Sequence, residues 1–353
     1  MLEGILMRTE SWRPIGISAL LPILVFWPVA LSADQAELDA ATDTVRIAIG
    51  VLDGDERQVF GRIREVEVGT DGDIFILDDQ ALVSSWFGPD GTFSGRAGRA
   101  GGGPGVFRSP VGMALDRRGL LHVLDQALRR ITVFERTAEG LALVRDVRLP
   151  VQGGDFCIEG DRYYVLAPLQ QGLIHVFTLD GEPLASFGEL VADVPTEMKR
   201  HEDILRQMQN LGRLLCVAGT QQIVFVPVES PLVRAFGADG ALLWETRLRP
   251  FYQRRYELSQ GGRGIRLAPD PESNSAHTTL SVVKDGETLV VTLAEATLQD
   301  PVGIMEWRIL ALADGRETVR RDASGILAAS GPTRRVTFVN HPFPQVFVEQ
   351  IPQ

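Results

Sequence analysis

One segment of the sequence gathers side chains that recognise anions. Between residues 249 and 266 there are five arginines and three aromatic residues but a single acidic residue, Glu257, so the segment carries a charge of +4 in a chain of net charge −11. Guanidinium groups bind carboxylate and phosphate with paired hydrogen bonds, and they stack on aromatic rings. The pattern predicts a ligand- or partner-binding face that consists of Arg249, Tyr252, Arg254, Arg255, Arg263 and Arg266. The alternative is a solvated basic loop, or one held by salt bridges to the acidic body of the protein.

Other motifs of catalytic or metal chemistry are weak. The glycine-rich run 98–105 leads into a proline turn and then a strand pattern, whereas a dinucleotide-binding loop needs a helix at that point. The five histidines show no metal-ligand spacing, and two cysteines cannot complete a four-ligand zinc site. The sequence therefore assigns no catalytic residue, no metal and no cofactor. It leaves open a site assembled from side chains that are distant along the chain.

The composition narrows the class of protein. A net charge of −11 argues against bulk nucleic-acid binding, which usually requires a basic protein. Hydrophobic residues make up 44% of the chain, which is enough for a large core and argues against disorder. The 36 glycines and 20 prolines indicate many turns. We expect an ordered, turn-rich body.

The elements that must position these residues repeat along the chain. Short apolar strands alternate with polar turns, and the glycine that closes each repeat falls at 91, 140, 181, 240 and 315. The first two spacings, 49 and 41 residues, fit a four-stranded propeller blade with a period of roughly 40–50 residues. The last two spacings, 59 and 75, are longer and indicate insertions.

Each long spacing contains a segment that departs from the repeat. At about 194–212, Ile204, Leu205, Met208 and Leu211 recur at helical spacing, and Thr196 could cap the start. We expect a helix there that covers the body or docks a partner. The second insertion, at about 249–278, is the basic segment, which we interpret as a loop.

An acidic residue ends the second strand of two repeats. Residues 73–78 match residues 120–125 at an offset of 47, and each run ends in aspartate, Asp78 or Asp125. A third copy, 336–340, has Asn340 in that position. Aspartate readily accepts hydrogen bonds from nearby backbone amides, so we expect these side chains to close turns.

The best-preserved repeats resemble a known family. Gly101-Gly102-Gly103-Pro104-Gly105-Val106-Phe107-Arg108-Ser109-Pro110, followed by 111–125 and by Arg130-Ile131-Thr132-Val133-Phe134, looks like the NHL-type repeat of bacterial six-bladed β-propellers. The match is strongest over residues 62–145. The resemblance implies a ring scaffold that usually binds something, and it implies no single activity.

The two ends of the repeat region complement each other. The final repeat stops after its third strand, 345–351, while residues 44–49 form a strand pattern that no repeat claims. We expect this strand to complete the last blade, because a shared blade removes an exposed strand edge. The predicted fold class is all-β, a six-bladed β-propeller of four-stranded blades, closed by the N-terminal strand and carrying one inserted helix.

The N-terminus has the pattern of a targeting segment. An uncharged, mostly apolar run at 15–32 follows Arg8 and Arg13 and ends in small residues, which is typical of a secretory signal. We predict a signal peptide at 1–33, a linker at 34–43 and the propeller at 44–353. The protein would then be periplasmic or extracellular, without a membrane span in the mature chain, and monomeric. An uncleaved N-terminal anchor is the alternative.

The two cysteines, Cys157 and Cys216, occupy matching positions in the innermost strands of adjacent blades. An oxidising compartment would allow a disulfide. Facing sheets lie about 10 Å apart, however, while disulfides need Cα atoms about 4.4–6.8 Å apart. We therefore predict two buried free thiols.

Two functions follow from these observations. The first is an exported, non-enzymatic binding module that recognises a small anion, a peptide or an envelope protein with one loop face. The second is a propeller enzyme, a lyase or hydrolase, with a metal or histidine in the central channel. Three or four Asp, Glu, Asn or His side chains that converge at one mouth of the axis would favour the enzyme. An apolar or scattered-polar channel would favour the module.

Overall fold

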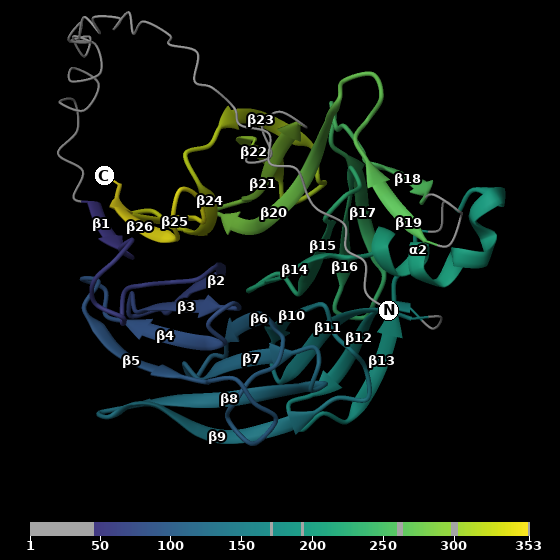
Figure 1. Cartoon of the computed structure of the whole chain (residues 1–353). Helices are drawn as coiled ribbons and strands as arrows, with labels where there is room; N and C mark the ends of the chain where they lie inside the picture. Colours follow the sequence, from purple (N-terminus) through teal and green to yellow (C-terminus); the bar gives the residue numbers. More distant parts are fainter. Residues whose placement is uncertain (1–45, 170–171, 192–193, 260–263, 298–302, 352–353) are drawn as a thin grey trace, which may run out of the picture. The chain divides into compact units, whose positions relative to one another are not determined.

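Strands dominate the computed structural model, which describes residues 46–169, 172–191, 194–259, 264–297 and 303–351. The predicted signal peptide and linker, 1–43, lie outside these residues. Within the described ranges, six four-stranded antiparallel sheets form the blades of a propeller (Figure 1). The predicted fold class is confirmed.

The first three blades follow one another along the chain. Blade 1 consists of β2 (Ile63–Val68), β3 (Ile74–Asp78), β4 (Val83–Phe87) and β5 (Phe93–Ala97). Blade 2 consists of β6 (Pro110–Leu115), β7 (Leu121–Asp125), β8 (Arg130–Thr137) and β9 (Gly140–Arg148). Blade 3 consists of β10 (Asp155–Glu159), β11 (Arg162–Leu169), β12 (Gly172–Thr178) and β13 (Pro183–Phe187).

The last three blades contain both insertions and the closure. Blade 4 consists of β14 (Gly212–Val217), β15 (Gln222–Pro227), β16 (Leu232–Gly237) and β17 (Leu242–Arg247). Blade 5 consists of β20 (Ser275–Asp285), β21 (Thr288–Thr297), β22 (Ile304–Ala311) and β23 (Glu317–Asp322). Blade 6 consists of β24 (Ile326–Ser330), β25 (Arg334–Val339), β26 (Gln345–Gln350) and β1 (Arg46–Ile49).

The core lies between the blades. β3 and β7 are buried at every position because neighbouring blades cover both faces of each sheet, and their residues favour the β conformation. Apolar clusters of buried side chains join neighbouring blades around the ring. The first strand of each blade contacts the first strand of the next, and β24 contacts β2. These six strands, β2, β6, β10, β14, β20 and β24, therefore surround the axis.

The predicted closure of the ring is confirmed. β1 pairs antiparallel with β26, with Ile47 opposite Val348 and Ile49 opposite Val346. Asn340 crosses the same seam: its Oδ1 accepts a hydrogen bond from the Ile63 amide at 2.7 Å, and its Nδ2 donates to the Ile63 carbonyl at 2.8 Å. The N-terminal strand and one side chain thus join blade 6 to blade 1.

The turn-closing aspartates behave as predicted. Asp78 accepts hydrogen bonds from the amides of Gly61 at 2.6 Å and Ala81 at 2.8 Å. Asp125 accepts from Arg108 at 2.7 Å and from Leu128 at 2.9 Å. Each carboxylate ties its own turn to the connection that enters the blade. The glycine-rich run is also the predicted connection, between β5 and β6.

The first insertion contains the predicted helix, with one correction. A 3-10 helix, η1 (Thr196–His201), continues directly into α2 (Glu202–Gln209), and α2 contacts β11. Leu205 is buried, whereas Ile204 is exposed. The predicted cap is wrong: Pro195 occupies the N-cap position and no side chain caps the helix, because Thr196 already lies inside the first turn.

The second insertion is not simply a loop. It contains a hairpin of β18 (Arg255–Leu258) and β19 (Ile265–Ala268), which pair antiparallel with Tyr256 opposite Leu267. Residues 260–263 lie outside the described residues. The interpretation as a loop is therefore wrong over 255–258 and 265–268, since these two segments satisfy each other's backbone groups.

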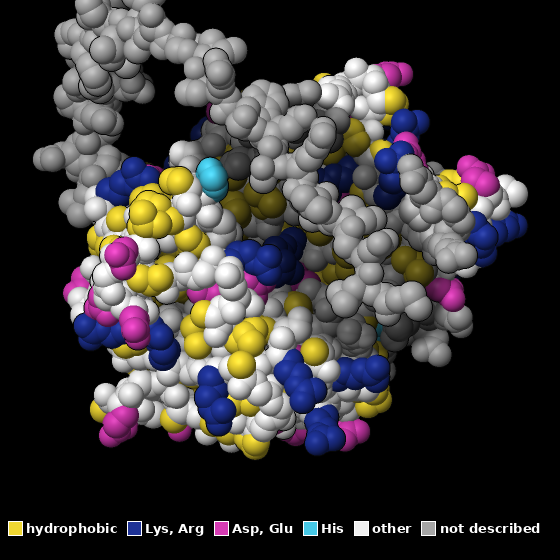
Figure 2. Space-filling view, in the orientation of Figure 1, with side chains coloured by type: hydrophobic (Ala, Val, Ile, Leu, Met, Phe, Trp, Pro, Cys, Tyr) yellow, Lys and Arg dark blue, Asp and Glu magenta, His cyan; other side chains and the backbone are white. Residues whose placement is uncertain are grey.

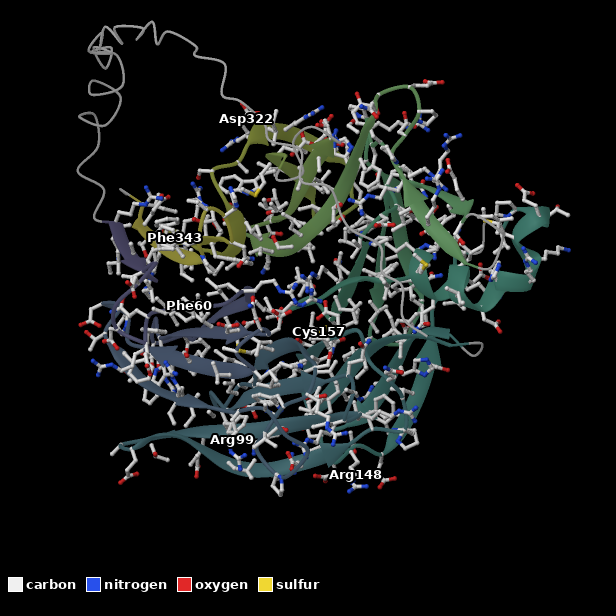
Figure 3. The ribbon with its side chains drawn as sticks, viewed as in Figure 1. Phe60, Arg99, Arg148, Cys157, Asp322 and Phe343 are labelled. Carbon is white, nitrogen blue, oxygen red and sulfur yellow. A yellow bond between two sulfur atoms is a disulfide. The ribbon has the colours of Figure 1, made fainter. Side chains whose placement is uncertain are left out.

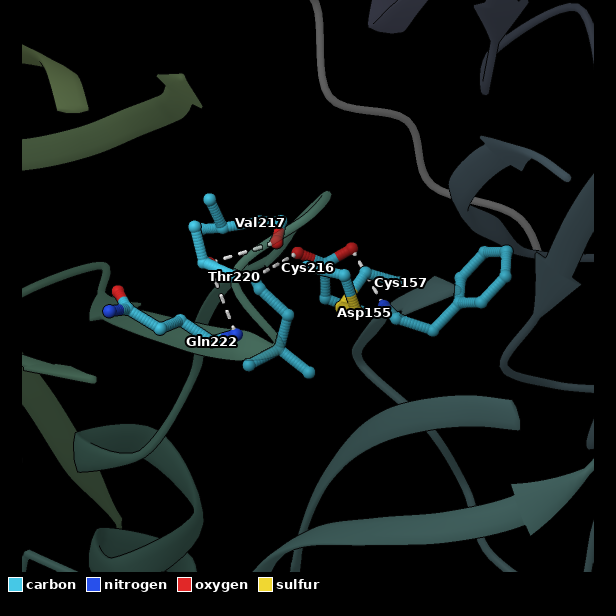
Figure 4. Close-up of a disulfide and its surroundings, with 8 residues drawn as sticks. Asp155, Cys157, Cys216, Val217, Thr220 and Gln222 are labelled. Atoms are coloured by element: carbon cyan, nitrogen blue, oxygen red, sulfur yellow. Dashed lines mark hydrogen bonds between the residues drawn. A yellow bond between two sulfur atoms is a disulfide. The ribbon is translucent and has the colours of Figure 1, made fainter. Parts of the chain in front are cut away.

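The prediction of two free thiols is wrong. Cys157 on β10 and Cys216 on β14 form a disulfide with Cα atoms 5.5 Å apart (Figure 4). Figure 3 places Cys157 close to the middle of the ring and Arg148, the last residue of β9, at its outer edge. The 10 Å separation of facing sheets does not hold at this depth, because neighbouring blades converge toward the axis.

The sequence predicts no membrane span in the mature chain. Among the residues that the structure describes, no helix is long and apolar enough to span a membrane.

Candidate functional site

A cavity of about 150 Å³ lies at the axis of the ring. We call it the axial cavity. The first strands β2, β10, β14, β20 and β24 supply most of its wall, which is apolar on the side of blades 5 and 6 except for Ser281. Its charged residues are Arg64, Glu65, Glu67, Asp155 and Arg213. In the space-filling view, basic side chains with acidic ones beside them gather at the middle of the visible face (Figure 2).

A β-bulge in β2 explains how one strand contributes three of these residues. Ile63 pairs with Asp78 and Glu65 pairs with Leu77, so Arg64 is an extra residue without a partner in the ladder. Its Nε donates to the Val111 carbonyl of β6 at 3.1 Å. Glu65 and Glu67 are two residues apart, which places them on the same face of the strand.

Two of the three carboxylates also connect neighbouring blades. Glu65 Oε2 accepts a hydrogen bond from the Met113 amide at 2.6 Å. Asp155 Oδ2 accepts from the Leu214 amide at 2.9 Å. Gly112 leaves room for Asp155, because a Cβ at that position would lie 3.0 Å from Oδ1. Glu67 has no hydrogen bond to the part of the chain that the structure describes.

The environment favours the neutral form of these carboxylates. Burial is the main cause, and it raises the pKa of Glu65 from 4.5 to about 8, with a further contribution from the charge of Asp155. Burial also raises the pKa of Glu67, and the charge of Glu65 adds to the effect. The pKa of Asp155 is raised by burial as well, although Arg213 opposes the shift. Withdrawal from water disfavours a charged carboxylate, so neutral acids can exist here near neutral pH.

Among the described residues, neither arginine of the axial cavity has an ion-pair partner. Arg64 bonds to Val111 and Arg213 Nε donates to the Leu280 carbonyl at 3.1 Å, and these are their only hydrogen bonds to described residues. No carboxylate oxygen among those residues lies within 4.0 Å of either guanidinium group. Burial lowers the pKa of Arg64, and the positive charge of Arg213 lowers it further.

A second cavity, of about 310 Å³, adjoins the first and shares Glu67 with it. We call it the mouth cavity. It lies among the turns that follow β2, β6 and β10, and Cys216 of the disulfide is part of its wall. Its arginines are paired: Arg117 bonds to Glu159 at 3.1 Å, and Arg136 bonds to Asp73 at 2.7 Å and to Asp71. The mouth cavity thus differs from the axial cavity in charge pairing.

The arginines predicted from the sequence lie elsewhere, in the second insertion. Arg254 bonds to Glu229 at 2.7 Å, and Arg266 bonds to Glu257 at 2.5 Å. Arg255 lies 3.7 Å from the same Glu257. The hairpin brings Arg255 and Arg266 together, while Arg254 is held against blade 4.

The remaining predicted residues are dispersed. The Arg249 carbonyl accepts a hydrogen bond from the buried Arg308 at 3.1 Å, and the ring of Tyr252 stacks on His277 at 5.0 Å. Arg263 lies outside the described residues. The ligand-binding role of this set stays a prediction.

The histidines lie apart from the axial cavity. His122 is buried and its Nδ1 is 2.8 Å from the hydroxyl of Tyr163, while burial lowers the pKa of His122 to about 4. In the described ranges, no group of three or more His, Cys, Asp and Glu has the geometry to hold a metal ion.

Sequence reasoning missed all five charged residues of the axial cavity. The available signal was a charged residue inside a first strand, where the repeat otherwise places apolar residues. Arg64, Glu65 and Glu67 interrupt β2, Asp155 begins β10, and Arg213 lies near the start of β14. Their convergence could be anticipated only after the six first strands were recognised as the axis.

Comparisons with known proteins support the fold. No family model matches the chain, and no curated protein matches it. Among solved structures, a putative exported protein from Bacteroides fragilis has a TM-score of 0.54 at 9% identity, with 88% of this chain and 96% of that chain covered. A member of the DUF4221 family from Bacteroides vulgatus has a TM-score of 0.54 at 8% identity, with 87% and 96% covered. U3-55K has a TM-score of 0.51 at 10% identity, with 88% and 99% covered. At these identities the likeness shows the fold alone.

Proposed function

We propose that this protein is an exported, non-enzymatic binding module, an NHL-like propeller whose ligand occupies the axial cavity. One observation carries the proposal: two arginines and three carboxylates surround a cavity, yet neither of these two arginines is within 4.0 Å of a described carboxylate. Buried charges that serve only stability are usually paired. Arginines and carboxylates that are held apart around a cavity can pair with charged or polar groups of a bound ligand.

The wall of the axial cavity supports recognition of a small molecule. Pockets for small ligands are mostly apolar, with a few polar groups that fix orientation. Val282, Leu327 and Phe338 supply apolar surface, and the five charged residues supply the polar groups. The mouth cavity is the wider space beside it, and we take it as the entrance. We expect the protein to act as a monomer, because one ring contains the whole site.

A thermal-shift screen of small carboxylates, phosphate esters, sugars and amines tests the proposal. A ligand that raises the melting temperature of the parent protein should fail to do so for Arg213→Gln. The matched control is Arg321→Gln, which removes an exposed arginine from the outer strand β23. An axial site would be contradicted by a ligand whose effect on the melting temperature is lost equally in both variants, or is retained in both.

Export belongs to the same proposal and has its own test. The support is the apolar run at 15–32 with its small-residue end. N-terminal sequencing of protein recovered from the cell envelope or medium should find a chain that begins near residue 34. An intact N-terminus in the membrane fraction would support the anchored alternative.

A second candidate function is an enzyme, and a specific observation favours it. Glu65, Glu67 and Asp155 converge at the axis, which reaches the number of side chains that we set for an enzyme, and their raised pKa values suit general acid–base chemistry. Mass spectrometry of the bound ligand after incubation separates the two functions. Unchanged ligand supports the module, and a product that Glu67→Gln no longer forms supports the enzyme.

A further inference from the structure

The two arginines of the axial cavity come from opposite sides of the ring. Arg64 belongs to β2 of blade 1 and Arg213 to β14 of blade 4, three blades away. Each is anchored through Nε to a carbonyl of the next blade, at Val111 and Leu280. The terminal guanidinium nitrogens, which form no hydrogen bond with described residues, are left for the cavity. Two guanidinium groups held in this way can share one anion between them.

The charge balance of the cavity also favours an anion. Both guanidinium groups stay positive at neutral pH, whereas burial holds Glu65 and Glu67 toward their neutral acids. Asp155 is the remaining carboxylate, and its two oxygens accept backbone hydrogen bonds from Phe156 and Leu214. With Glu65 and Glu67 neutral, the cavity keeps an excess positive charge, which is costly in a partly buried site without a counterion.

Resting on the proposed function and naming its ligand, we propose that the axial cavity binds a small monocarboxylate between Arg64 and Arg213, together with one proton. A carboxylate matches the planar donor pairs of the two guanidinium groups. The apolar wall at Val282, Leu327 and Phe338 suits a short hydrocarbon chain or a ring. The volume, about 150 Å³, limits the ligand to roughly the size of benzene.

Glu67 controls the passage to this site. It is the charged residue common to both cavities, so an anion that enters from the mouth passes its carboxyl group. As a neutral acid Glu67 admits the anion and can donate a hydrogen bond, whereas as a carboxylate it repels it. An anion nearby in turn stabilises the proton on Glu67 or Glu65, so binding takes up a proton at pH values where one of these acids is otherwise ionised.

The charged groups that face Glu67 come from both cavities. Those of the axial cavity are Arg64 and Glu65 on its own strand, Asp155 on β10 and Arg213 on β14. Those of the mouth cavity are Asp71, Asp116, Arg117, Arg136 and Glu159. The described lining residues of β6, β20 and β24 carry no charge. The acidic groups outnumber the basic ones, and their negative charge favours the protonated form of Glu67.

Calorimetric titration of the purified protein with sodium butyrate tests the proposal. The titration is run at pH 6 and pH 9, each in two buffers of different ionisation enthalpy, so that proton uptake is counted. We expect tight binding at pH 6, where the acids already hold their protons, and at pH 9 an affinity at least ten-fold weaker, with uptake of a proton on binding. Arg213→Gln should weaken binding at least ten-fold, and Arg321→Gln should leave it unchanged. Glu67→Gln should show a smaller difference in affinity between the two pH values than the parent, because only Glu65 then ionises in the cavity.

Further arms separate the other outcomes. Arg64→Lys keeps the charge and removes the paired donors, so it should weaken binding even if Arg213→Gln proves unfolded by its melting curve. Tighter binding of inorganic phosphate than of butyrate, or butyrate binding at pH 9 without proton uptake, would overturn the inference. A neutral or cationic compound that binds in an Arg213-dependent way would overturn the inference while leaving the axial ligand site of the proposed function intact. No Arg213-dependent binding of any kind would overturn both.

Discussion

Arginine residues gather in two regions of this protein, and the two regions treat their charge in opposite ways. In the second insertion, Arg254 bonds to Glu229 of blade 4, and Arg266 bonds to Glu257 on the facing strand of the hairpin. In the axial cavity, Arg64 and Arg213 have no described carboxylate within 4.0 Å.

This contrast indicates which charged residues mark a candidate ligand site. A dense basic segment is easy to see in a sequence, but neighbouring acids can neutralise it locally. Charged residues scattered over the first strands of blades 1, 3 and 4 are inconspicuous, yet the ring brings them to one cavity. The predictions below test this contrast.

Opening the ring should have the largest effect, because the axial cavity needs all the blades while the hairpin of the insertion does not. Deleting residues 44–49 removes β1 and exposes the edge of β26, as well as the apolar surface that Ile47 and Ile49 cover. We expect an unfolded or aggregated protein, measured by circular dichroism and gel filtration. A variant that melts within a few degrees of the parent would contradict the role of β1 in closure.

Removing the disulfide should have the next largest effect. The bridge joins β10 to β14 two residues beyond the Asp155–Leu214 hydrogen bond, so it supports the axial wall directly. Cys157→Ser combined with Cys216→Ser should lower the free energy of unfolding by about 2–5 kcal/mol in a denaturant titration. Thiol titration of the unreduced, denatured parent should find no reactive thiol, and two thiols would disprove the bridge.

The stability of the parent should depend on pH through Glu65. Its pKa is 4.5 when exposed and about 8 in the folded protein, so the folded state binds the extra proton between these values. The stabilisation is complete below the lower pKa and is lost as pH rises through the upper one. Glu65→Gln mimics the neutral acid and keeps an acceptor for Met113. The free energy of unfolding of this variant, relative to that of the parent, should therefore increase by about 1.4 kcal/mol or more between pH 5 and pH 8. This amount corresponds to at least one pKa unit. Urea titrations across this range measure the gain, and a constant difference would count against a neutral Glu65.

Changes in the basic insertion should have the smallest effect on stability. Arg266 and Glu257 are partly exposed, and exposed ion pairs contribute about 0.2–1 kcal/mol. Arg266→Ser should shift the free energy of unfolding by no more than about 1 kcal/mol, and Arg254→Ser by somewhat more, because it leaves the largely buried Glu229 without its partner. If the predicted partner face is real, the pair of changes should weaken capture of a partner from envelope extract without affecting butyrate binding. A large loss of melting temperature would show that these arginines brace the ring.

Much of the fold could be predicted because its determinants are local. Short stretches of sequence are enough to show the turn aspartates Asp78 and Asp125, the glycine that closes each repeat, and the unclaimed strand pattern at 44–49. The hairpin in the second insertion was missed because its strands are short and carry polar residues, so no alternation of apolar side chains marks them.

The candidate site could not be predicted in the same way, because its geometry depends on distances between blades. The separation of Cys157 and Cys216 was misjudged, since a sheet spacing was applied where strands converge. Arg64 enters the cavity through a bulge that the repeat pattern does not mark. Asp155 and Arg213 are single charged residues in separate strands, and only the shared axis of the ring brings them to one cavity.

A crystal soaked in sodium bromide provides the most direct test of the central claim, because bromide is a monoanion that anomalous scattering locates. At pH 6 we predict a bromide peak in the axial cavity, between the guanidinium groups of Arg64 and Arg213, which is absent from crystals of Arg213→Gln. Bromide bound along β18 and β19, with none in the axial cavity, would contradict the claim that the charges of the axis are the ones held for a ligand.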